Sequence, residues 1–178
     1  MKTSEEYLAL SIKALQKEKN WQDLGKCHAT ANEHFQEDWI NENCSFDVRV
    51  RDDFNDDKDA GGFDIVSIDD KKMRIQAKIR ATNIYLEQTR RHSKKNKGAA
   101  SKNGHVVYRV GEMDVFLISR PFLEEYSNMN KWELIALPAK ALENPKNPGF
   151  IYSNVPKKIW KEYVGKTKEV LEEVYESI

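Results

Sequence analysis

The sequence predicts an α/β fold in which helices flank a mixed central β-sheet, and two observations lead to this prediction. The first is the order of patterns along the chain: two helical patterns, about five or six strand patterns, and a final helical pattern. The second is the segment MDVFLISRP, which is apolar almost throughout, as is typical of a strand covered on both faces. The order alone fits either an α/β or an α+β sandwich around one mixed sheet. With 178 residues, the chain is expected to form one domain, over residues 1–178.

The helical patterns lie at the two ends of the chain. The expected helices cover residues 4–18, residues from about 21 or 25 to 41, and residues 157–178, and the first two make up the N-terminal region 1–42. Ser4 followed by two glutamates is a typical helix start. Ala31, Phe35 and Trp39 recur at the spacing of one helix face in the second pattern. The last pattern is also amphipathic.

The strand patterns fill the region 45–142, which we expect to form the sheet. They are CSFDVRVR, FDIVSI, MRIQAKIR, HVVYRV, MDVFLISRP and KWELIALP. The segment DDKK separates FDIVSI from MRIQAKIR and indicates a β-hairpin. PAKAL favours a short helix after the last strand. Between MRIQAKIR and HVVYRV the alternation fades, so residues 86–104 are expected to be a loop.

Composition narrows the class of protein. Charged residues make up 33% of the chain and hydrophobic residues 39%, which indicates a globular protein with a heavily solvated surface. The formal net charge is zero, so any attraction to nucleic acid must come from local patches. No run approaches the ~18 apolar residues of a membrane span, and Cys27 and Cys44 form no CxxC pair. The charged N-terminus is unlike a signal peptide. We expect a cytoplasmic protein with no membrane partner.

Three polar residues lie where the predicted hairpin would bring them together. Asp64 opens one strand, and Gln76 and Lys78 share the polar side of the next. A carboxylate and an amide oxygen are ligands for a hard divalent cation. A lysine beside them would orient or deprotonate an attacking water, or offset charge on a phosphate. The grouping therefore fits phosphodiester hydrolysis, whereas the plainer alternative is the polar side of a solvent-facing edge strand.

The same residues carry a family resemblance. FDIV and IQAK, with eleven residues between Asp64 and Gln76, resemble the two-part motif of the PD-(D/E)xK nuclease superfamily, which has the restriction-endonuclease-like fold. Asp64 matches the first acid of that motif and Lys78 its lysine, whereas Gln76 stands where a second acid is usual. With the later strands, the sequence looks like a small phage, archaeal or bacterial endonuclease branch with a Q-x-K variant of the motif. The resemblance covers roughly residues 25–142.

The resemblance implies a metal-dependent DNA endonuclease with Mg²⁺ or Mn²⁺ as its cofactor. Asp64, Gln76 and the backbone carbonyl of Ala77 would hold the metal, and Lys78 would assist the attacking water. The fold usually begins with a helix whose glutamate faces the metal, which here is Glu33 or, less well placed, Glu37. The alternative for Glu33 is an ordinary exposed carboxylate on a helix. Restriction, homing and junction-resolving roles all fit, with DNA as partner, a homodimer or higher oligomer, and no small-molecule cofactor. Two alternatives remain: a nucleic-acid-binding protein of the same fold that has lost cleavage, and a small interaction protein whose C-terminal helix recruits a partner.

The loop 86–104 offers a way to hold DNA. It contains six positively charged residues: Arg90, Arg91, Lys94, Lys95, Lys97 and Lys102. A charge run is usually a solvated excursion, but beside a metal site these side chains would neutralise phosphates along a DNA backbone. Arg109, in the strand pattern HVVYRV, is a further candidate for a phosphate contact, with a surface ion pair as its alternative.

Overall fold

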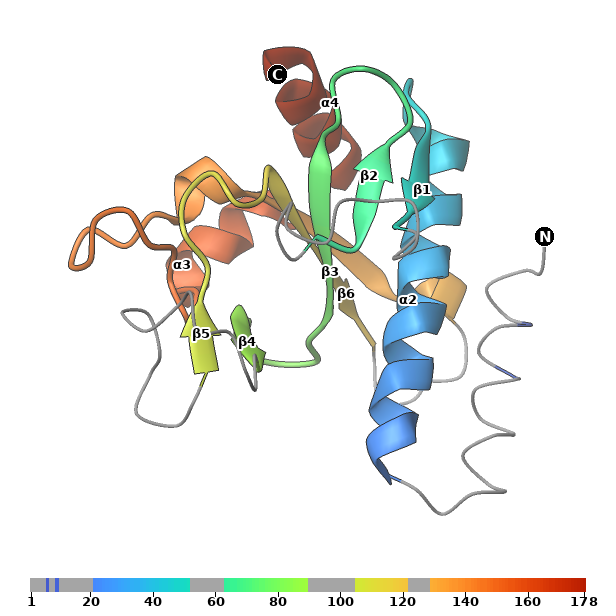
Figure 1. The fold of residues 1–178 in the computed structure, drawn as a ribbon, viewed down its shortest axis with the longest axis horizontal. Coiled ribbons are helices and arrows are strands. Elements are labelled where there is room, and N and C mark those ends of the chain that lie inside the picture. The colour runs from blue at the N-terminus through green and yellow to red at the C-terminus, as the bar shows by residue number, and fades with distance from the viewer. Residues whose placement is uncertain (1–5, 7–8, 10–20, 52–62, 90–104, 122–128) are drawn as a thin grey trace.

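The structure is a computed structural model that describes residues 6, 9, 21–51, 63–89, 105–121 and 129–178 of the chain (Figure 1). These residues form an α/β arrangement with a five-stranded mixed sheet and three α-helices. The helices are α2 (Trp21–Asn43), α3 (Lys157–Trp160) and α4 (Thr167–Ser177). The strands of the sheet are β1 (Val48–Val50), β2 (Ile65–Ser67), β3 (Arg74–Ile79), β6 (Val115–Arg120) and β7 (Glu133–Pro138). The helix expected over residues 4–18 falls largely outside the described residues.

The strand order of the sheet is β1-β2-β3-β6-β7. Only the pair β3–β6 is parallel, and the other three pairs are antiparallel, so the sheet is mixed as predicted. In β6, Val115, Leu117 and Ser119 are buried on one face and Phe116 and Ile118 on the other. This confirms the interior strand that the apolar segment MDVFLISRP predicts.

The predicted hairpin of β2 and β3 is also present. Ile65 lies opposite Ile75 in the antiparallel register. The turn between the strands includes Lys72, whose φ of 54° is left-handed. The hydroxyl of Ser67 donates to Asp69 at 2.8 Å and accepts from the backbone N–H of Met73 at 2.8 Å, so one side chain holds both ends of the turn.

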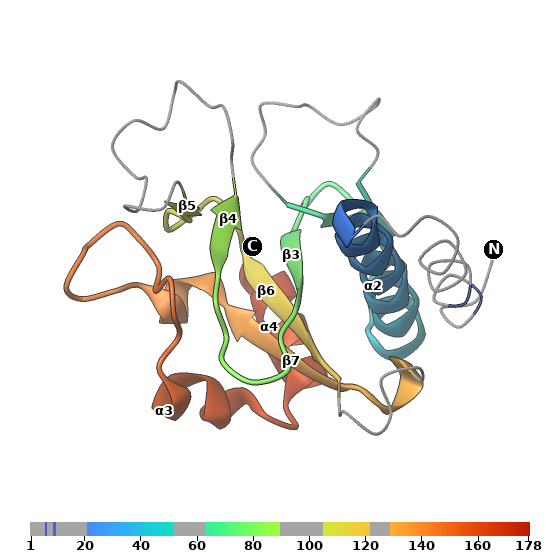
Figure 2. The ribbon, with the colours of Figure 1, turned by 90° about the horizontal axis from the view of Figure 1, so that it is seen from below.

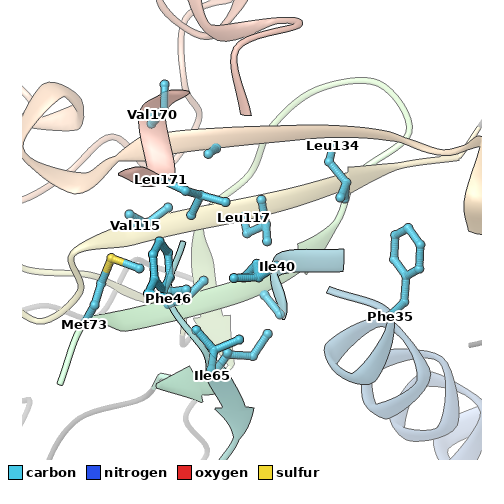
Figure 3. Packing of buried hydrophobic residues seen from close by; sticks show 14 of the residues in the cluster. Phe35, Ile40, Phe46, Ile65, Met73, Val115, Leu117, Leu134, Val170 and Leu171 are labelled. Carbon is cyan, nitrogen blue, oxygen red and sulfur yellow. The ribbon is translucent and has the colours of Figure 1, made fainter. Parts of the chain in front are cut away.

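Helices α2 and α4 cover one face of the sheet (Figure 3). Phe35 and Ile40 of α2 and Leu171 of α4 pack with Ile65 and Leu117 of the sheet in one buried cluster. Full burial of such a side chain contributes about 1.5–3 kcal/mol. This layer fixes where α2 lies relative to the end of β3.

The opposite face is covered without a long helix. Trp160 of α3 packs there with Tyr108, Ile84 and Leu86 against Phe116 and neighbouring residues of the sheet. A separate two-stranded ribbon of β4 (Glu87–Thr89) and β5 (His105–Val107) lies on this side. In both views the end of β3 lies between α2 and the β4–β5 ribbon (Figures 1 and 2).

The ribbon corrects two predictions. Glu87–Thr89 is a strand, although residues 86–104 are predicted to be a loop, and its polar sequence EQT carries no apolar alternation by which it could be recognised. HVVYRV contains a strand as predicted, but β5 pairs with β4 instead of joining the main sheet. The pairing of Thr89 with His105 brings the ends of segment 90–104 together.

The prediction of one continuous C-terminal helix over residues 157–178 is wrong. The segment contains α3, a 3₁₀ turn over Lys161–Tyr163, and then α4. Gly165 has a φ of 75°, a left-handed value that ends the helical path between the two. The short helix expected at PAKAL is confirmed as a 3₁₀ helix over Ala139–Leu142. No helix in the described ranges is long and apolar enough to cross a membrane.

Candidate active site at the end of strand β3

The hairpin brings Asp64 and Gln76 into direct contact. Ile75 and Ala77 belong to the buried cluster beneath α2 and α4. Because side chains alternate along a strand, Gln76 and Lys78 lie on the other face. Asp64, immediately before β2, lies opposite this part of β3, and its Oδ2 accepts hydrogen bonds from Nε2 of Gln76 and from the backbone N–H of Ala77, the latter at 3.0 Å. The convergence that the sequence predicts is therefore present.

Burial dominates the electrostatics of Asp64. Removal from water raises the pKa of its carboxyl group from the ordinary 3.8 to about 6. The charge of Lys78, the N–H of Ala77, the charge of Arg51 and the amide of Gln76 each lower the pKa, in that order, but do not cancel the effect of burial. A further cation beside Asp64 would therefore stabilise its ionised form.

Lys78 is half-buried, and its ammonium group is subject to opposite influences. Burial lowers its pKa most, and the positive charge of Arg80 lowers it further, whereas the negative charges of Asp64 and Glu33 raise it. Its Nζ lies 5.6 Å from the ring centre of Tyr108, a distance typical of a cation–π contact. A lysine in such surroundings is suited to hold or release a proton near the carboxylate.

Helix α2 supplies the second carboxylate near the lysine. Glu33 is close enough to Lys78 for its charge to act on the lysine. The other candidate, Glu37, is occupied elsewhere: it accepts from the N–H of Val50 at 3.2 Å and from Nδ1 of His34 at 2.9 Å. Of the two glutamates that the sequence offers, Glu33 is the one that joins the cluster.

A buried amide holds α2 against the sheet, and the sequence did not single it out. Gln36 is fully buried, and its Nε2 donates to the carbonyl of Leu117 at 3.0 Å and to the hydroxyl of Ser119 at 2.9 Å. Gln36 lies almost one helical turn after Glu33, so this contact fixes the part of α2 that faces Lys78. Ser119 is 83 residues away in sequence, so no local pattern announces the pair.

Two arginines near the cluster were also missed. Arg51 follows β1, lies with its guanidinium 5.0 Å from the ring centre of Phe63, and lowers the pKa of Asp64. Arg80 follows β3 and donates from Nε to the carbonyl of Tyr85 at 2.8 Å and from Nη1 to that of Ile79 at 2.7 Å. The alternation of MRIQAKIR already places Arg80 on the side of Gln76 and Lys78, so a signal for it was available.

The oxygen atoms around Asp64 fit a hard divalent cation once one amide turns. Oε1 of Gln76 is buried and has no hydrogen-bond partner among the described residues, while Nε2 faces Asp64 and lies 3.4 Å from the carbonyl of Ala77. Turning the amide by about 180° would give Oε1 to the cation beside the carboxylate and the carbonyl, an all-oxygen set suited to Mg²⁺. In the described ranges, no three His, Cys, Asp or Glu side chains form a metal-binding group.

Of the remaining candidates, Arg109 is the one within the described residues. Arg109 is exposed, its guanidinium lies 5.3 Å from the ring centre of Phe150, and its backbone N–H bonds to Glu112. It therefore does not join Asp64 and Lys78. The six cations predicted to bind nucleic acid, Arg90, Arg91, Lys94, Lys95, Lys97 and Lys102, lie outside the described residues.

A small cavity lies elsewhere in the molecule. Its volume is about 120 Å³, and it is lined by residues of the β6 approach, the end of β7 and α4. The lining includes Met113, Pro138 and Val174 but none of the residues around Asp64. The chemical groups of the candidate site thus gather on β3 and not in this cavity.

Searches among known protein families, curated proteins and solved structures give no match to this chain. Function is therefore inferred from the chemistry of one cluster, which contains Asp64, Gln76, Lys78 and Glu33.

Proposed function

We propose that this protein is a metal-dependent endodeoxyribonuclease of the PD-(D/E)xK type with a restriction-endonuclease-like core. The observation that supports it most is the contact of Asp64 with Gln76 beside the half-buried ammonium group of Lys78. A carboxylate and an amide oxygen can hold a divalent cation, and a lysine beside them can act on the attacking water, so the three groups fit this chemistry.

Each residue has a distinct role in the proposal. Asp64, Oε1 of Gln76 and the carbonyl of Ala77 would hold Mg²⁺ or Mn²⁺, which when bound polarises the phosphate and stabilises the leaving oxygen. Lys78 would orient the attacking water and offset charge on the phosphate. In its neutral form, which the lowered pKa favours, the amine would instead accept the proton of that water. Glu33, on α2, would stabilise the charged form of Lys78 and keep its ammonium group in place.

The surrounding cations suit a phosphate-containing substrate. Arg51, Lys78 and Arg80 contribute three positive charges near the two carboxylates of Asp64 and Glu33. Among these five described groups the cations outnumber the carboxylates by one, although the whole chain has a formal net charge of zero. A phosphodiester would be attracted here and not to the surface in general.

The amide of Gln76 favours one rival function. An acid at this position would add a formal charge to the metal ligands, whereas the amide donates an N–H to Asp64. A nucleic-acid-binding protein that keeps the fold without cleaving would tolerate that arrangement. Such a protein would have the same surrounding cations and would differ from the nuclease only in that it does not cleave its substrate.

Plasmid cleavage separates the two functions. Supercoiled plasmid is incubated with wild-type protein in Mg²⁺, in Mn²⁺ and in EDTA, and with the variants Lys78→Ala and Lys158→Ala, the latter removing an exposed lysine of α3. We expect metal-dependent nicking or linearisation by wild type and Lys158→Ala, and a loss of at least a hundredfold in Lys78→Ala. Salt-sensitive binding with no cutting under either metal would favour the non-cleaving protein.

The proposal extends to assembly if both strands of a duplex are cut. One site of this kind cuts one strand, so double-strand cleavage calls for two copies related by a twofold axis. Sedimentation of the protein with and without duplex would then detect a dimer or higher oligomer as the cutting species.

A further inference from the structure

An aromatic ring is held outward on the segment that leaves β3. Ile84 and Leu86 are fully buried, whereas Tyr85 between them is 45% exposed. The N–H of Leu86 donates to the carbonyl of Ser153 at 2.8 Å, and the N–H of Val155 donates to that of Ile84 at 2.9 Å. Because the backbone is fastened on both sides of Tyr85, little conformational freedom would be lost if a ligand covered its ring.

Arg80 connects Tyr85 to the candidate site. Its Nε donates to the carbonyl of Tyr85, and its charge acts on Lys78, two residues earlier in the chain. Both bonds described for its guanidinium go to backbone carbonyls, those of Tyr85 and Ile79. Neither bond neutralises the arginine charge, which remains able to attract a phosphate near the backbone of Tyr85.

A cation and a fixed aromatic ring together match one nucleotide: the cation attracts the phosphate, and the ring stacks on the base. In a paired duplex the faces of the bases are covered by their neighbours, so a side chain at the surface stacks only on an unpaired base. Such stacking contributes about 1–3 kcal/mol per base. Alternation alone explains why Tyr85 points outward, whereas the bond from Arg80 to its carbonyl places a cation at the backbone of the same residue.

We propose that Tyr85, with Arg80, forms a stacking site for an unpaired base of a nucleic acid strand whose neighbouring phosphate lies toward Lys78. This inference rests on the nucleic-acid binding that the proposed function requires. It predicts that single-stranded, frayed or branched DNA binds more tightly than a fully paired duplex of the same sequence.

Binding of two matched probes tests the inference. The probes are a fluorescent 20-nucleotide single strand and the duplex of the same sequence, at one salt concentration and in EDTA so that no cleavage occurs. The variants are Tyr85→Ala, Tyr85→Phe, which keeps the ring, and Ile68→Ala, which removes another exposed apolar side chain (55% exposed). We expect Tyr85→Ala to weaken single-strand binding roughly 5- to 150-fold and duplex binding less than about twofold. Tyr85→Phe and Ile68→Ala should bind both probes as wild type does.

Two outcomes would overturn the inference: Tyr85→Ala affecting single-strand binding no more than Ile68→Ala does, or weakening both probes equally. These outcomes are distinguishable from failure of the nuclease proposal, which is decided by plasmid cleavage with Lys78→Ala. An active nuclease whose single-strand binding ignores Tyr85 would lack the stacking site. A protein that never cleaves, yet loses single-strand binding in Tyr85→Ala, would retain the stacking site without the enzyme.

Discussion

At the scale of single residues, Asp64 holds its proton more tightly in the folded protein than in the unfolded chain. Burial raises its pKa from 3.8 to about 6, so the native state binds more protons than the unfolded state between these values. The contribution of this group is present below pH 3.8 and is lost as the pH rises through 6. A shift of this size corresponds to roughly 3 kcal/mol.

The variant Asp64→Asn, which cannot titrate, isolates this effect. Between pH 4 and pH 7.5, in EDTA, we expect the free energy of unfolding of wild type to fall by roughly 2.4 kcal/mol relative to that of the variant. Urea unfolding at several pH values measures the difference. A difference that stays constant over this range would show that Asp64 ionises at its ordinary pKa.

Substitutions of Gln76 test the proposed metal ligands most directly. Gln76→Glu places a second carboxylate against Asp64, so the metal-free variant should be less stable than wild type because of like-charge repulsion. The added charge should tighten Mg²⁺ binding roughly tenfold. Calorimetric titration with Mg²⁺ measures the affinity, and plasmid cleavage should be kept or increased.

Gln76→Leu is the matched control, since it keeps much of the volume but offers no oxygen atom. It should bind Mg²⁺ more weakly than wild type and lose cleavage. Complete loss of metal-dependent cleavage in Gln76→Glu would count against Gln76 as a ligand.

At the scale of elements, the position of α2 depends on one buried amide. Gln36→Leu removes both hydrogen bonds to β6 and leaves the hydroxyl of Ser119 and the carbonyl of Leu117 without this donor. We expect a loss of about 1–3 kcal/mol in the free energy of unfolding, measured with urea. Glu42→Ala, at an exposed position of the same helix, should change it by less than about 0.5 kcal/mol. Equal losses in both variants would mean that Gln36 has no special part in holding the helix.

The same elements show why sequence predicted some features and missed others. The contact of Asp64 with Gln76 was predictable because it follows from alternation in a local hairpin. The pairing of Gln36 with Ser119 was not, because it depends on how α2 packs on a sheet formed by distant segments. The strand Glu87–Thr89 was missed because three polar residues that pair across a long connection carry no periodic signal. Gly165 offered the usual sign of a helix end, yet the apolar spacing around it favoured one continuous helix.

At the scale of the whole molecule, a chain with a formal net charge of zero needs local cations to hold DNA. The six Lys and Arg residues between 90 and 102 are the densest such group in the sequence. The pairing of β4 with β5 brings together Thr89 and His105, the residues that flank this segment, and Figure 2 shows β4 beside β3. We therefore expect these cations to account for much of the salt dependence of DNA binding.

The triple variant Lys94→Ala, Lys95→Ala, Lys97→Ala tests this expectation against a control of equal charge. The control removes Lys157, Lys158 and Lys161, three exposed lysines near α3, so both variants lose three positive charges. Each phosphate contact contributes about 0.9 to the slope of log K against log salt for duplex DNA, so the first variant should lower the magnitude of the slope by up to about 2.7. The control should leave it nearly unchanged. Because net charge changes equally in both, a similar loss of slope in the two variants would assign binding to the overall charge and remove the special role of segment 90–104.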